Sequence, residues 1–335
     1  MNAKFALVRP SYVSDTDPLA ALYITRLSIC IATAATCIND SIFADDIRKL
    51  IGIEPLEGTI PKTELRLLLR ARLPEVEHAA SESSSVLTQN VEMLSDLLTL
   101  SALEQQILSF TALTQHHTLL HEVVTTAPLM GKECLIDFLA DALNIDHDLV
   151  QHALKPTSPL IATRILNIEA QPGEPGFQLS VPKSLTNALF VHADDINALM
   201  RALLEPSPPA TLGKHEFQYL NSETALLSAY VANACTERTT GINILIYGPP
   251  GTGKTEYARW LASLLKKKLF QVRATDDADQ SISGLDRLSF FQLSQRFLQN
   301  SDAIMLFDEI EDVFPASDPL VRLSAAYGRS PENSS

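Results

Sequence analysis

Cysteine is scarce in this chain of 335 residues, and the few cysteines present do not form metal-binding pairs. None stands in a CxxC arrangement; they are Cys30, Cys37, Cys134 and Cys235. Scattered single cysteines argue against a structural zinc site and a disulfide framework, and they are typical of a reducing compartment. The N-terminus has no recognisable secretory signal, so we expect a cytoplasmic protein.

Basic residues are also in short supply. The 26 Lys and Arg stand against 40 Asp and Glu, which gives a formal net charge of −14 at pH 7. This balance disfavours nucleic acid or an anionic membrane as the default partner. A long uncharged hydrophobic run is missing too. The most apolar stretch, 19–38, contains Arg26 and several threonines, so it predicts a soluble helix rather than a membrane span.

Glycine is rare, with 12 residues in the chain, yet three glycines fall within the octet GPPGTGKT at 248–255. The octet fits G-x-x-x-x-G-K-[ST], the pattern of phosphate-binding (Walker A) loops. Its glycines let backbone N–H groups turn inward around a triphosphate. Lys254 can reach the β- and γ-phosphates during catalysis, and Thr255 offers a hydroxyl to Mg²⁺. The predicted nucleotide contacts are Gly248, Pro249, Pro250, Gly251, Thr252, Gly253, Lys254, Thr255 and Glu256.

The sequence around the octet has the pattern that such a loop requires. Residues 242–247, INILIY, form a short apolar run that predicts a buried strand of a parallel sheet. Residues 255–265 carry apolar side chains at helical spacing, so the loop is expected to open onto a helix N-terminus, which favours anions.

A second motif follows further along the chain. Residues 303–307, AIMLF, predict another buried strand, and Asp308 and Glu309 come directly after it. A carboxylate at this end of a strand can hold the Mg²⁺ that bridges the phosphates, and a neighbouring carboxylate can activate the attacking water. We therefore assign Asp308 as a ligand of Mg²⁺ and Glu309 as the catalytic residue that activates the attacking water.

Together, GPPGTGKT and the later FDEIEDVF (a Walker B motif) resemble the AAA+ ATPases, specifically the AAA clade. Residues 216–220 resemble the segment that flanks the adenine in that family, and the resemblance covers about 214–316. It implies an α/β P-loop NTPase fold, with ATP and Mg²⁺ as cofactors. It also implies a homo-oligomeric ring, when complete, that remodels a macromolecular client; the motifs do not identify that client.

The chain departs from this family in its last part. The family sheet has strand order 5-1-4-3-2, with 242–247 as strand 1, 269–272 as strand 2 and 304–307 as strand 3. We find no further strand after Asp312, and strand 4, the sensor residue, the arginine finger and the helical lid have no counterpart. We therefore expect an incomplete parallel sheet, with strands 1 and 3 about 9–10 Å apart and unpaired backbone groups between them. The nearest match to the family's pore loop, 281–284, lacks an aromatic residue.

The region ahead of the motifs is expected to be α-rich. For 1–85 the clearest predicted helices are 45–51 and 63–73, and the polar, Ser-rich 75–85 predicts a linker. His116, His117 and His121 have metal-like spacing, but without nearby acidic or Cys partners we interpret them as surface residues.

Residues 86–205 predict a second domain with a winged-helix-like unit. Helices at 133–143 and 148–154 have helix-turn-helix spacing, and 160–168 with 177–181 reads as a strand–turn–strand wing. Between 101 and 205 there are 5 Lys and Arg against 12 Asp and Glu, a balance of −7. This charge favours a role in protein interaction over DNA binding. A stiff Pro-rich linker at 206–213 then leads into the ATPase half, 214–335.

Three functions remain open at this point. The first is an ATP-hydrolysing AAA+ protein that remodels a client. The second is a nucleotide-gated regulatory or protein-binding module with little turnover. The third is a DNA-associated ATPase, against which the charge argues.

Overall fold

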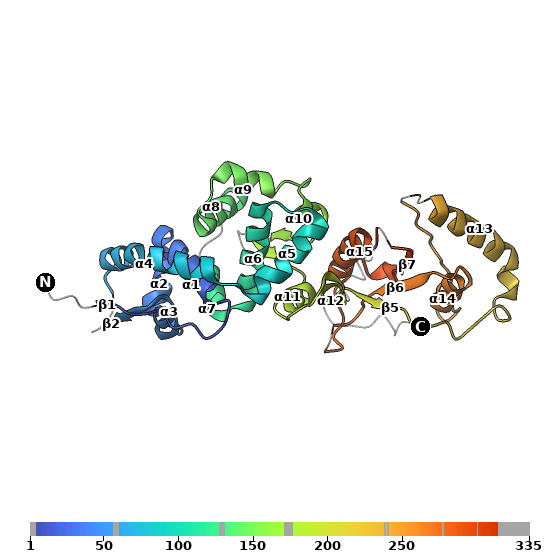
Figure 1. Cartoon of the computed structure of the whole chain (residues 1–335), viewed down its shortest axis with the longest axis horizontal. Coiled ribbons are helices and arrows are strands. Elements are labelled where there is room, and N and C mark those ends of the chain that lie inside the picture. Colours follow the sequence, from blue (N-terminus) through green and yellow to red (C-terminus); the bar gives the residue numbers. More distant parts are fainter. Residues whose placement is uncertain are drawn as a thin grey trace, which may run out of the picture. The chain divides into compact units, whose positions relative to one another are not determined.

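The computed structural model describes residues 5–55, 60–126, 131–170, 177–237, 239, 241–276, 278–299 and 301–313. The chain divides into two compact units, residues 1–200 and 201–335 (Figure 1). The predicted boundary between 85 and 86 falls inside the first unit, and the predicted start of the ATPase half falls inside the second.

The first unit is mainly helical. Its helices are α1 (Asp17–Cys30), α2 (Ala32–Asp40), α3 (Ala44–Ile51), α4 (Lys62–Glu82), α5 (Val86–Leu98), α6 (Ala102–His116), α7 (Thr118–Thr125), α8 (Gly131–Leu143), α9 (His147–Ala153), α10 (Pro159–Ala162), α11 (Lys183–Leu189) and α12 (Ile196–Met200). Two short antiparallel pairs accompany them, β1 (Phe5–Leu7) with β2 (Ile53–Pro55) and β3 (Asn167–Ala170) with β4 (Phe177–Ser180).

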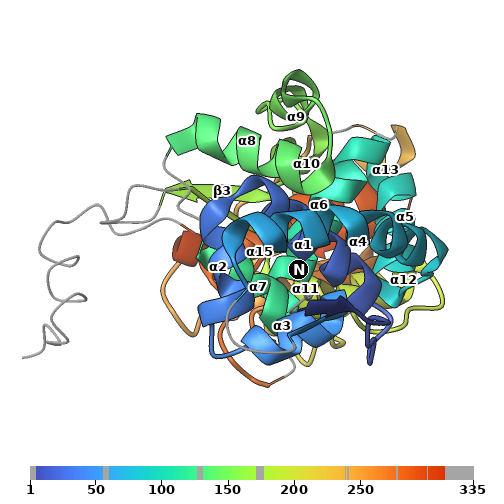
Figure 2. The same cartoon turned by 90° about the vertical axis from the view of Figure 1, so that its left-hand side faces the viewer.

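Helix α1 lies at the centre of this unit. It packs on α2, α4, α7 and α8, and Figure 2 looks onto this group of helices. Its side chains are buried over most of its length, including Ala20, Ile24 and Leu27, which have no exposed surface. The apolar stretch 19–38 is therefore divided between α1 and α2, which bend by 118° at their junction. No helix in the described part of the chain is by itself long and apolar enough to span a membrane. Taken together, α1 and α2 would reach that length and apolar composition.

Helix α4 is longer than the sequence predicts. The prediction ends the helix at Leu73, before Pro74, and makes 75–85 a linker; the structure continues the helix to Glu82. Pro74 lies on the exposed side of α4, so the carbonyl four residues earlier is left to solvent rather than buried. Val76 and Ala80 are buried on the other side, and this packing extends the helix through the proline.

The structure at 131–181 agrees only in part with the predicted winged-helix-like pattern. Helices α8 and α9 follow each other closely, with Asp146 capping α9 through its bond to the N–H of Asp148 at 2.9 Å. The predicted strand at 160–168 is wrong at its start, because residues 159–162 form α10. Ser158 caps that helix and Pro159 occupies its first position, where proline is favoured. The turn at 171–176 lies outside the described residues.

The described part of the second unit holds a small sheet and three α-helices. Its elements are β5 (Leu204–Pro206), η1 (Gln218–Leu220), α13 (Asn221–Glu237), α14 (Lys254–Leu264), β6 (Lys268–Val272), α15 (Gly284–Leu298), β7 (Ala303–Leu306) and η2 (Ile310–Val313). Strands β6 and β7 pair in parallel, with Leu269 opposite Ile304, as the family order implies for strands 2 and 3.

Strand β5 was not predicted. It pairs antiparallel with β6, so the sheet order is β5-β6-β7 and the first residue of the expected Pro-rich linker, Pro206, is part of the sheet. Pro206 ends this strand at the sheet edge, where its missing N–H costs no ladder bond. The next residue, Ser207, donates its N–H to the Leu269 carbonyl at 2.9 Å.

The segment ahead of the phosphate loop differs most from expectation. Residues 242–247 form no strand, and Ile244, Leu245 and Tyr247 are 42%, 70% and 86% exposed. The prediction of a buried strand is therefore wrong. An apolar run becomes a buried strand only beside another strand, and no described strand lies alongside these residues. The segment is not paired with β7, and residues 314–335 lie outside the described part of the chain.

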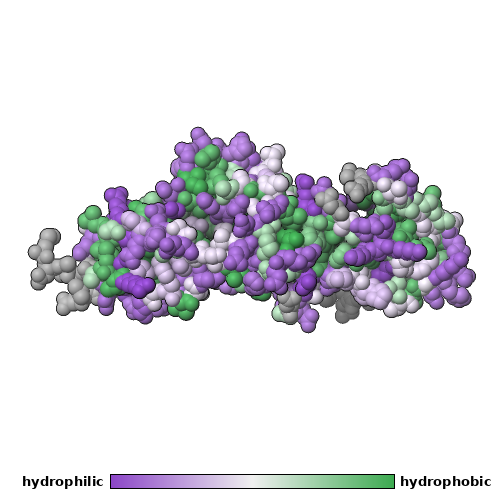
Figure 3. All heavy atoms as spheres, viewed as in Figure 1, coloured by the Kyte–Doolittle hydropathy of each residue, from purple (hydrophilic) through white to green (hydrophobic). Residues whose placement is uncertain are grey.

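Unit 2 also exposes apolar side chains elsewhere. Tyr219, Leu226 and Tyr230 are each more than half exposed on η1 and α13. Figure 3 shows hydrophobic and hydrophilic surface interspersed over this unit in the view of Figure 1. Part of the apolar area is thus exposed on α13 and on the segment 242–247, whereas Val272, Phe290 and Leu293 are buried.

Candidate nucleotide-binding site

The predicted phosphate loop forms a tight turn that leads into a helix. Gly248, Gly251 and Gly253 have φ values of 154°, 75° and 81°, which side chains with a Cβ rarely adopt. The Thr252 hydroxyl donates to the Pro249 carbonyl at 2.9 Å and so closes the turn. Gly253 is the N-cap of α14, so the predicted order of glycine loop followed by helix N-terminus is present.

Lys254 and Thr255 occupy the first turn of α14. The Lys254 ammonium donates to the carbonyls of Gly248 and Pro249 at 3.1 and 3.0 Å, which places the charge within the loop. The Thr255 hydroxyl donates to Oδ2 of Asp308 at 2.7 Å. The structure therefore brings together the two residues predicted to bind the metal, although they lie 53 positions apart in the sequence.

Asp308 and Glu309 form a turn one residue beyond the end of β7, after Phe307. Oδ1 of Asp308 accepts the Glu309 N–H at 3.1 Å, and Glu309 has φ of 52°, a left-handed conformation uncommon outside glycine. The Glu309 side chain is exposed, whereas Asp308 is half-buried. The two carboxylates thus have different surroundings, which agrees with separate roles for them.

Arg287 contacts this turn from α15, and it was not among the predicted site residues. It lies on α15, is 2% exposed, and donates from Nη2 to the Asp308 carbonyl. Its guanidinium also lies 4.8 Å from the centre of the Phe307 ring, which Phe291 contacts edge-on at 5.6 Å. A sequence signal was available, because Arg287 stands one turn before Phe290 and Phe291 on the apolar side of its helix.

Glu256 was predicted to contact the nucleotide, but its side chain has other partners. Its carboxylate accepts the N–H and hydroxyl of Thr211 at 2.6 and 2.8 Å, and the N–H of Leu212 at 3.3 Å. Arg259 donates to its other oxygen at 2.7 Å. The Thr211 N–H, together with Arg259, lowers the pKa of Glu256 to about 2. This carboxylate is engaged on the side of α14 that faces 211–212.

An aromatic cluster packs on α14 next to these polar contacts. Phe217, which is 2% exposed, contacts Tyr257 edge-on at 5.2 Å and stacks on Trp260 at 5.4 Å. The Tyr257 hydroxyl is hydrogen-bonded to Thr224 of α13 at 2.9 Å. A Cβ at Gly253 would lie 3.7 Å from the Phe217 ring, an ordinary van der Waals distance, so segment 216–220 lies against the glycine loop. The positive φ of Gly253, 81°, is what favours glycine at this position.

The Thr255 hydroxyl and the Asp308 carboxylate fit Mg²⁺. Both supply hard oxygen ligands, and Mg²⁺ in phosphate sites usually takes only one or two protein ligands while water and phosphate fill the rest. The 2.7 Å hydrogen bond shows that the two oxygens are close enough to share one small cation. Among the described residues, no group of three or more His, Cys, Asp or Glu is arranged to hold a metal.

The three histidines at 116, 117 and 121 have separate surroundings and do not form a common cluster. His116 stacks on Phe190 at 3.8 Å, and His121 is exposed. His117 is mostly buried, contrary to the surface interpretation: its Nδ1 accepts the Leu120 N–H at 3.4 Å and its Nε2 lies 3.2 Å from Asp17. It has a structural role as the N-cap of α7.

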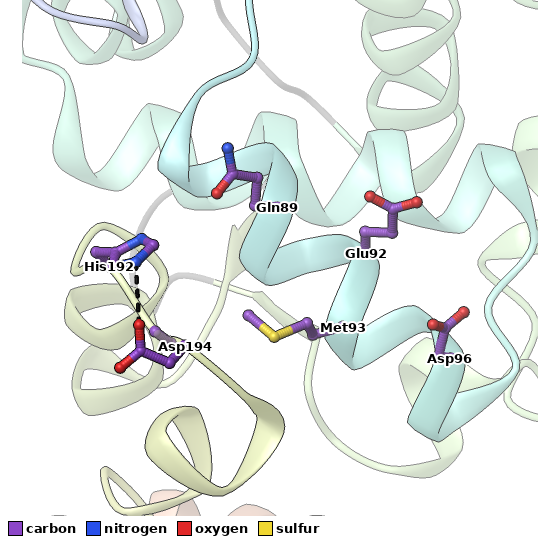
Figure 4. A pocket seen from close by; sticks show the side chains of 7 residues that line it. Gln89, Glu92, Met93, Asp96, His192 and Asp194 are labelled. Carbon is purple, nitrogen blue, oxygen red and sulfur yellow. Dashed lines mark ion pairs between the residues drawn. The ribbon is translucent and has the colours of Figure 1, made fainter.

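A hollow of about 420 Å³ in the first unit has a different chemistry (Figure 4). It lies between α5 and the turn at 192–194, and the side chains around it are mainly acidic or polar. His192 is paired with Asp194 at 3.4 Å, as the dashed line shows. Three carboxylates, from Glu92, Asp96 and Asp194, would repel a triphosphate, so this hollow is not a second phosphate site.

Comparison with known proteins agrees with the loop geometry. Residues 244–326 match the family described as "ATPase family associated with various cellular activities (AAA)". No solved structure gives a significant match to the chain. Over the segment that holds the loop and the Asp308–Glu309 turn, the chain is therefore similar to the AAA family of ATPases.

Three curated relatives each match part of the chain. An ATP-dependent zinc metalloprotease FtsH from Mycobacterium leprae is 34% identical over 88 residues, covering 25% of this chain and 11% of that protein. A replication factor C large subunit from Picrophilus torridus is 32% identical over 81 residues, covering 23% and 19%. A proteasome-associated ATPase from Mycobacterium ulcerans is 30% identical over 89 residues, covering 21% and 15%. The chain thus spans less than a fifth of the length of these three relatives.

Proposed function

We propose that this chain binds Mg-ATP at residues 248–255 and hydrolyses its γ-phosphate. The observation that carries the proposal is the 2.7 Å contact between Thr255 and Asp308, which joins the phosphate loop to the predicted metal carboxylate. The loop and the N-terminus of α14 direct backbone N–H groups and a helix dipole at an anion, and this favours phosphate.

Each residue of the site has a distinct part in the proposed reaction. The loop N–H groups hold the phosphates, and Lys254 neutralises charge on the β- and γ-phosphoryl oxygens. Thr255 and Asp308 hold Mg²⁺, which when bound neutralises charge that develops between the phosphates. Glu309 orients the attacking water and accepts its proton, while Arg287 fixes the turn that carries both carboxylates.

At the level of the whole protein, we propose a homo-oligomeric machine that uses ATP to remodel a macromolecular client in the cytoplasm. The support is the family that residues 244–326 match. The relatives' names do not agree on a client, because they include a protease, a proteasome-associated ATPase and a replication factor subunit. The missing aromatic residue at 281–284 gives no support to polypeptide threading in particular.

The Lys254→Ala variant tests the nucleotide proposal. Loss of one charged phosphate contact is expected to weaken Mg-ATP binding by roughly tenfold to a hundredfold, or about 1.5–3 kcal/mol. Fluorescent nucleotide titration of the folded variant and the parent measures the difference. Equal affinity in both proteins would refute the assignment of the loop.

A second candidate function is a nucleotide-gated module with little turnover. The observation that favours it is the exposure of 242–247, which leaves the phosphate loop without a flanking strand among the described residues. A multiple-turnover ATPase assay separates the two functions. Robust turnover by residues 1–335 supports the hydrolase, and stoichiometric binding without turnover supports the gated module.

A further inference from the structure

The linker segment, residues 207–212, is attached to the first turn of α14 by a carboxylate. Glu256 accepts the Thr211 N–H at 2.6 Å, the Thr211 hydroxyl at 2.8 Å and the Leu212 N–H at 3.3 Å. Three donors from two consecutive residues thus converge on one oxygen atom. The end of the linker segment cannot move away from α14 without breaking all three hydrogen bonds.

A second attachment lies one turn further along α14. Nε of Arg259 donates to the Ser207 hydroxyl at 3.1 Å, and Nη2 donates to Oε1 of Gln271 on β6 at 3.4 Å. Arg259 also pairs with Glu256 at 2.7 Å. The two ends of the linker segment, the helix and the sheet are therefore joined in one polar cluster.

The linker segment is held by this cluster rather than by close apolar packing. A cavity of about 280 Å³ lies beside it, and the cavity walls include Pro208, Pro209 and Leu212 from the segment and Trp260 and Leu269 from α14 and β6. Apolar groups around a cavity contribute less to stability than groups in contact. Loss of the polar cluster is therefore expected to free the segment.

The same cluster is adjacent to the phosphate loop. Glu256 directly follows Thr255, so its backbone belongs to the first turn of α14 on which phosphate is expected to bind. A Cβ at Gly253 would lie 3.8 Å from the Leu212 side chain, which places the end of the linker segment against the last glycine of the loop. A ligand that restrains the first turn of α14 therefore also restrains the Glu256 carboxylate, which is hydrogen-bonded to the linker segment.

We propose that Glu256 is a positioning residue that couples phosphate binding at 248–255 to the position of the linker segment. The inference rests on the proposed function, because it requires nucleotide at the loop. Phosphate on the loop N–H groups holds the first turn of α14, and this turn retains Thr211 and Leu212 through Glu256. The coupling is reciprocal, so an attached linker segment strengthens phosphate binding by the same factor as phosphate strengthens the attachment.

Hydrogen exchange of the full chain with and without Mg-AMP-PNP tests the coupling. In the parent chain, the nucleotide is expected to slow exchange in peptides covering the loop and in peptides covering the linker segment. In Glu256→Gln, the loop peptides are still expected to slow, whereas the linker peptides exchange at one rate in both conditions. Nucleotide affinity is expected to fall about fivefold in this variant, at the lower end of typical allosteric coupling.

Two further variants complete the experiment. Glu223→Gln removes a carboxylate from the first turn of α13, where Glu223 accepts the Ser222 hydroxyl at 2.8 Å, and it is expected to behave as the parent. Thr211→Val removes one donor of the cluster while preserving side-chain shape. It is expected to reduce the nucleotide effect on the linker peptides in part, and it provides the test if Glu256→Gln does not fold.

The possible failures are distinguishable. If Mg-AMP-PNP leaves the loop peptides of the parent unchanged, the proposed nucleotide function fails. If the loop peptides slow but the linker peptides do not, nucleotide binding stands and the coupling is overturned. Equal slowing of the linker peptides in the parent and in Glu256→Gln also overturns the role of Glu256.

Discussion

At the scale of single residues, Asp308 and Glu309 are neighbours with different environments. Asp308 is half-buried and holds the Thr255 hydroxyl, whereas Glu309 is exposed and adopts a left-handed backbone conformation. Because Asp308 contacts the phosphate loop, we expect it to contribute to nucleotide binding. Because Glu309 lies outside that contact, we expect it to contribute to hydrolysis. Substitutions at the two positions should therefore affect different steps.

We therefore expect Glu309→Gln to retain Mg-ATP binding and to lose turnover, since the amide keeps the side-chain shape but cannot accept the proton from water. Asp308→Ala is expected to weaken Mg²⁺-dependent binding itself. Nucleotide titration with and without Mg²⁺, followed by a phosphate-release assay, measures both effects. Hydrolysis by Glu309→Gln at the parental rate would show that another group activates the water.

Arg287 provides a second prediction at this scale. Arg287→Met is expected to lower the free energy of unfolding by about 1.5–3 kcal/mol, because the Asp308 carbonyl loses a charged donor. Arg287→Lys should lose less, since it keeps the charge but not the planar guanidinium that lies over Phe307. Urea unfolding measures both values. Arg296→Met, at an exposed position on the same helix, is the control, and an equal effect there would refute a specific role for Arg287.

At the scale of elements, the start of α1 is linked to α7 by one buried carboxylate. Asp17 accepts the Val13 and Ser14 N–H groups at 2.6 and 3.0 Å and lies 3.2 Å from Nε2 of His117. Burial opposes ionisation of Asp17, but the hydrogen bonds from Ser14, Val13 and His117 together outweigh it and lower the pKa. The junction of the two helices thus depends on a charged side chain within the core.

Asp17→Asn is expected to destabilise the chain by about 1.5–3 kcal/mol at neutral pH, the usual value for hydrogen bonds to a charged group. Because the folded pKa is lowered from 3.8, the contribution of Asp17 is complete above that value and is lost as the pH falls through the folded pKa. Unfolding of parent and variant between pH 7 and pH 3 should show the difference shrink below about pH 4. Asp46→Asn, at an exposed pair with Lys49, is the control. A difference that grows on acidification would contradict this interpretation.

At the scale of the whole molecule, charge limits the choice of partner. The net charge is −14, and Asp146 and Asp148 lie at the start of α9, the helix that the sequence analysis compared with a DNA-reading helix. Asp146 caps α9, and His147 pairs with Asp137 of α8 at 3.0 Å. The acidic balance of the sequence remains the reason to expect that nucleic acid is not a partner of this region.

The full chain is therefore expected not to bind random duplex DNA tighter than about 1 μM at about 150 mM salt, because its phosphates would meet an acidic surface. Fluorescence anisotropy with a labelled duplex measures this affinity. A known basic DNA-binding protein serves as the positive control. Sub-micromolar binding would favour the DNA-associated ATPase that the sequence left open.

Sequence reasoning predicted the local geometry of the glycine loop better than the long-range contacts around it. The order of glycine loop, Lys254, Thr255 and helix follows from local chemistry, since positive φ values and a helix N-terminus are set within a few residues. The partners of Glu256 and the role of Arg287 depend on segments 45 and 21 positions away, respectively. No local pattern encodes such pairings, although a lone charge on an apolar helix side was a usable sign for Arg287.

The sequence by itself determined the glycine turn that opens onto a helix, the strand predicted at 303–307 and the helices predicted at 45–51, 133–143 and 148–154. Each depends on composition and periodicity within one segment, whereas the parallel pairing of 269–272 with 304–307 was implied by the family resemblance. Only the tertiary structure decided that Pro74 stays inside a helix, that 204–206 joins the sheet and that 242–247 is exposed. In all three cases the outcome depends on the neighbour. Packing of Val76 and Ala80 extends α4 beyond its proline. Pairing with β6 makes 204–206 a strand. The apolar segment 242–247 has no described strand beside it and remains outside the sheet.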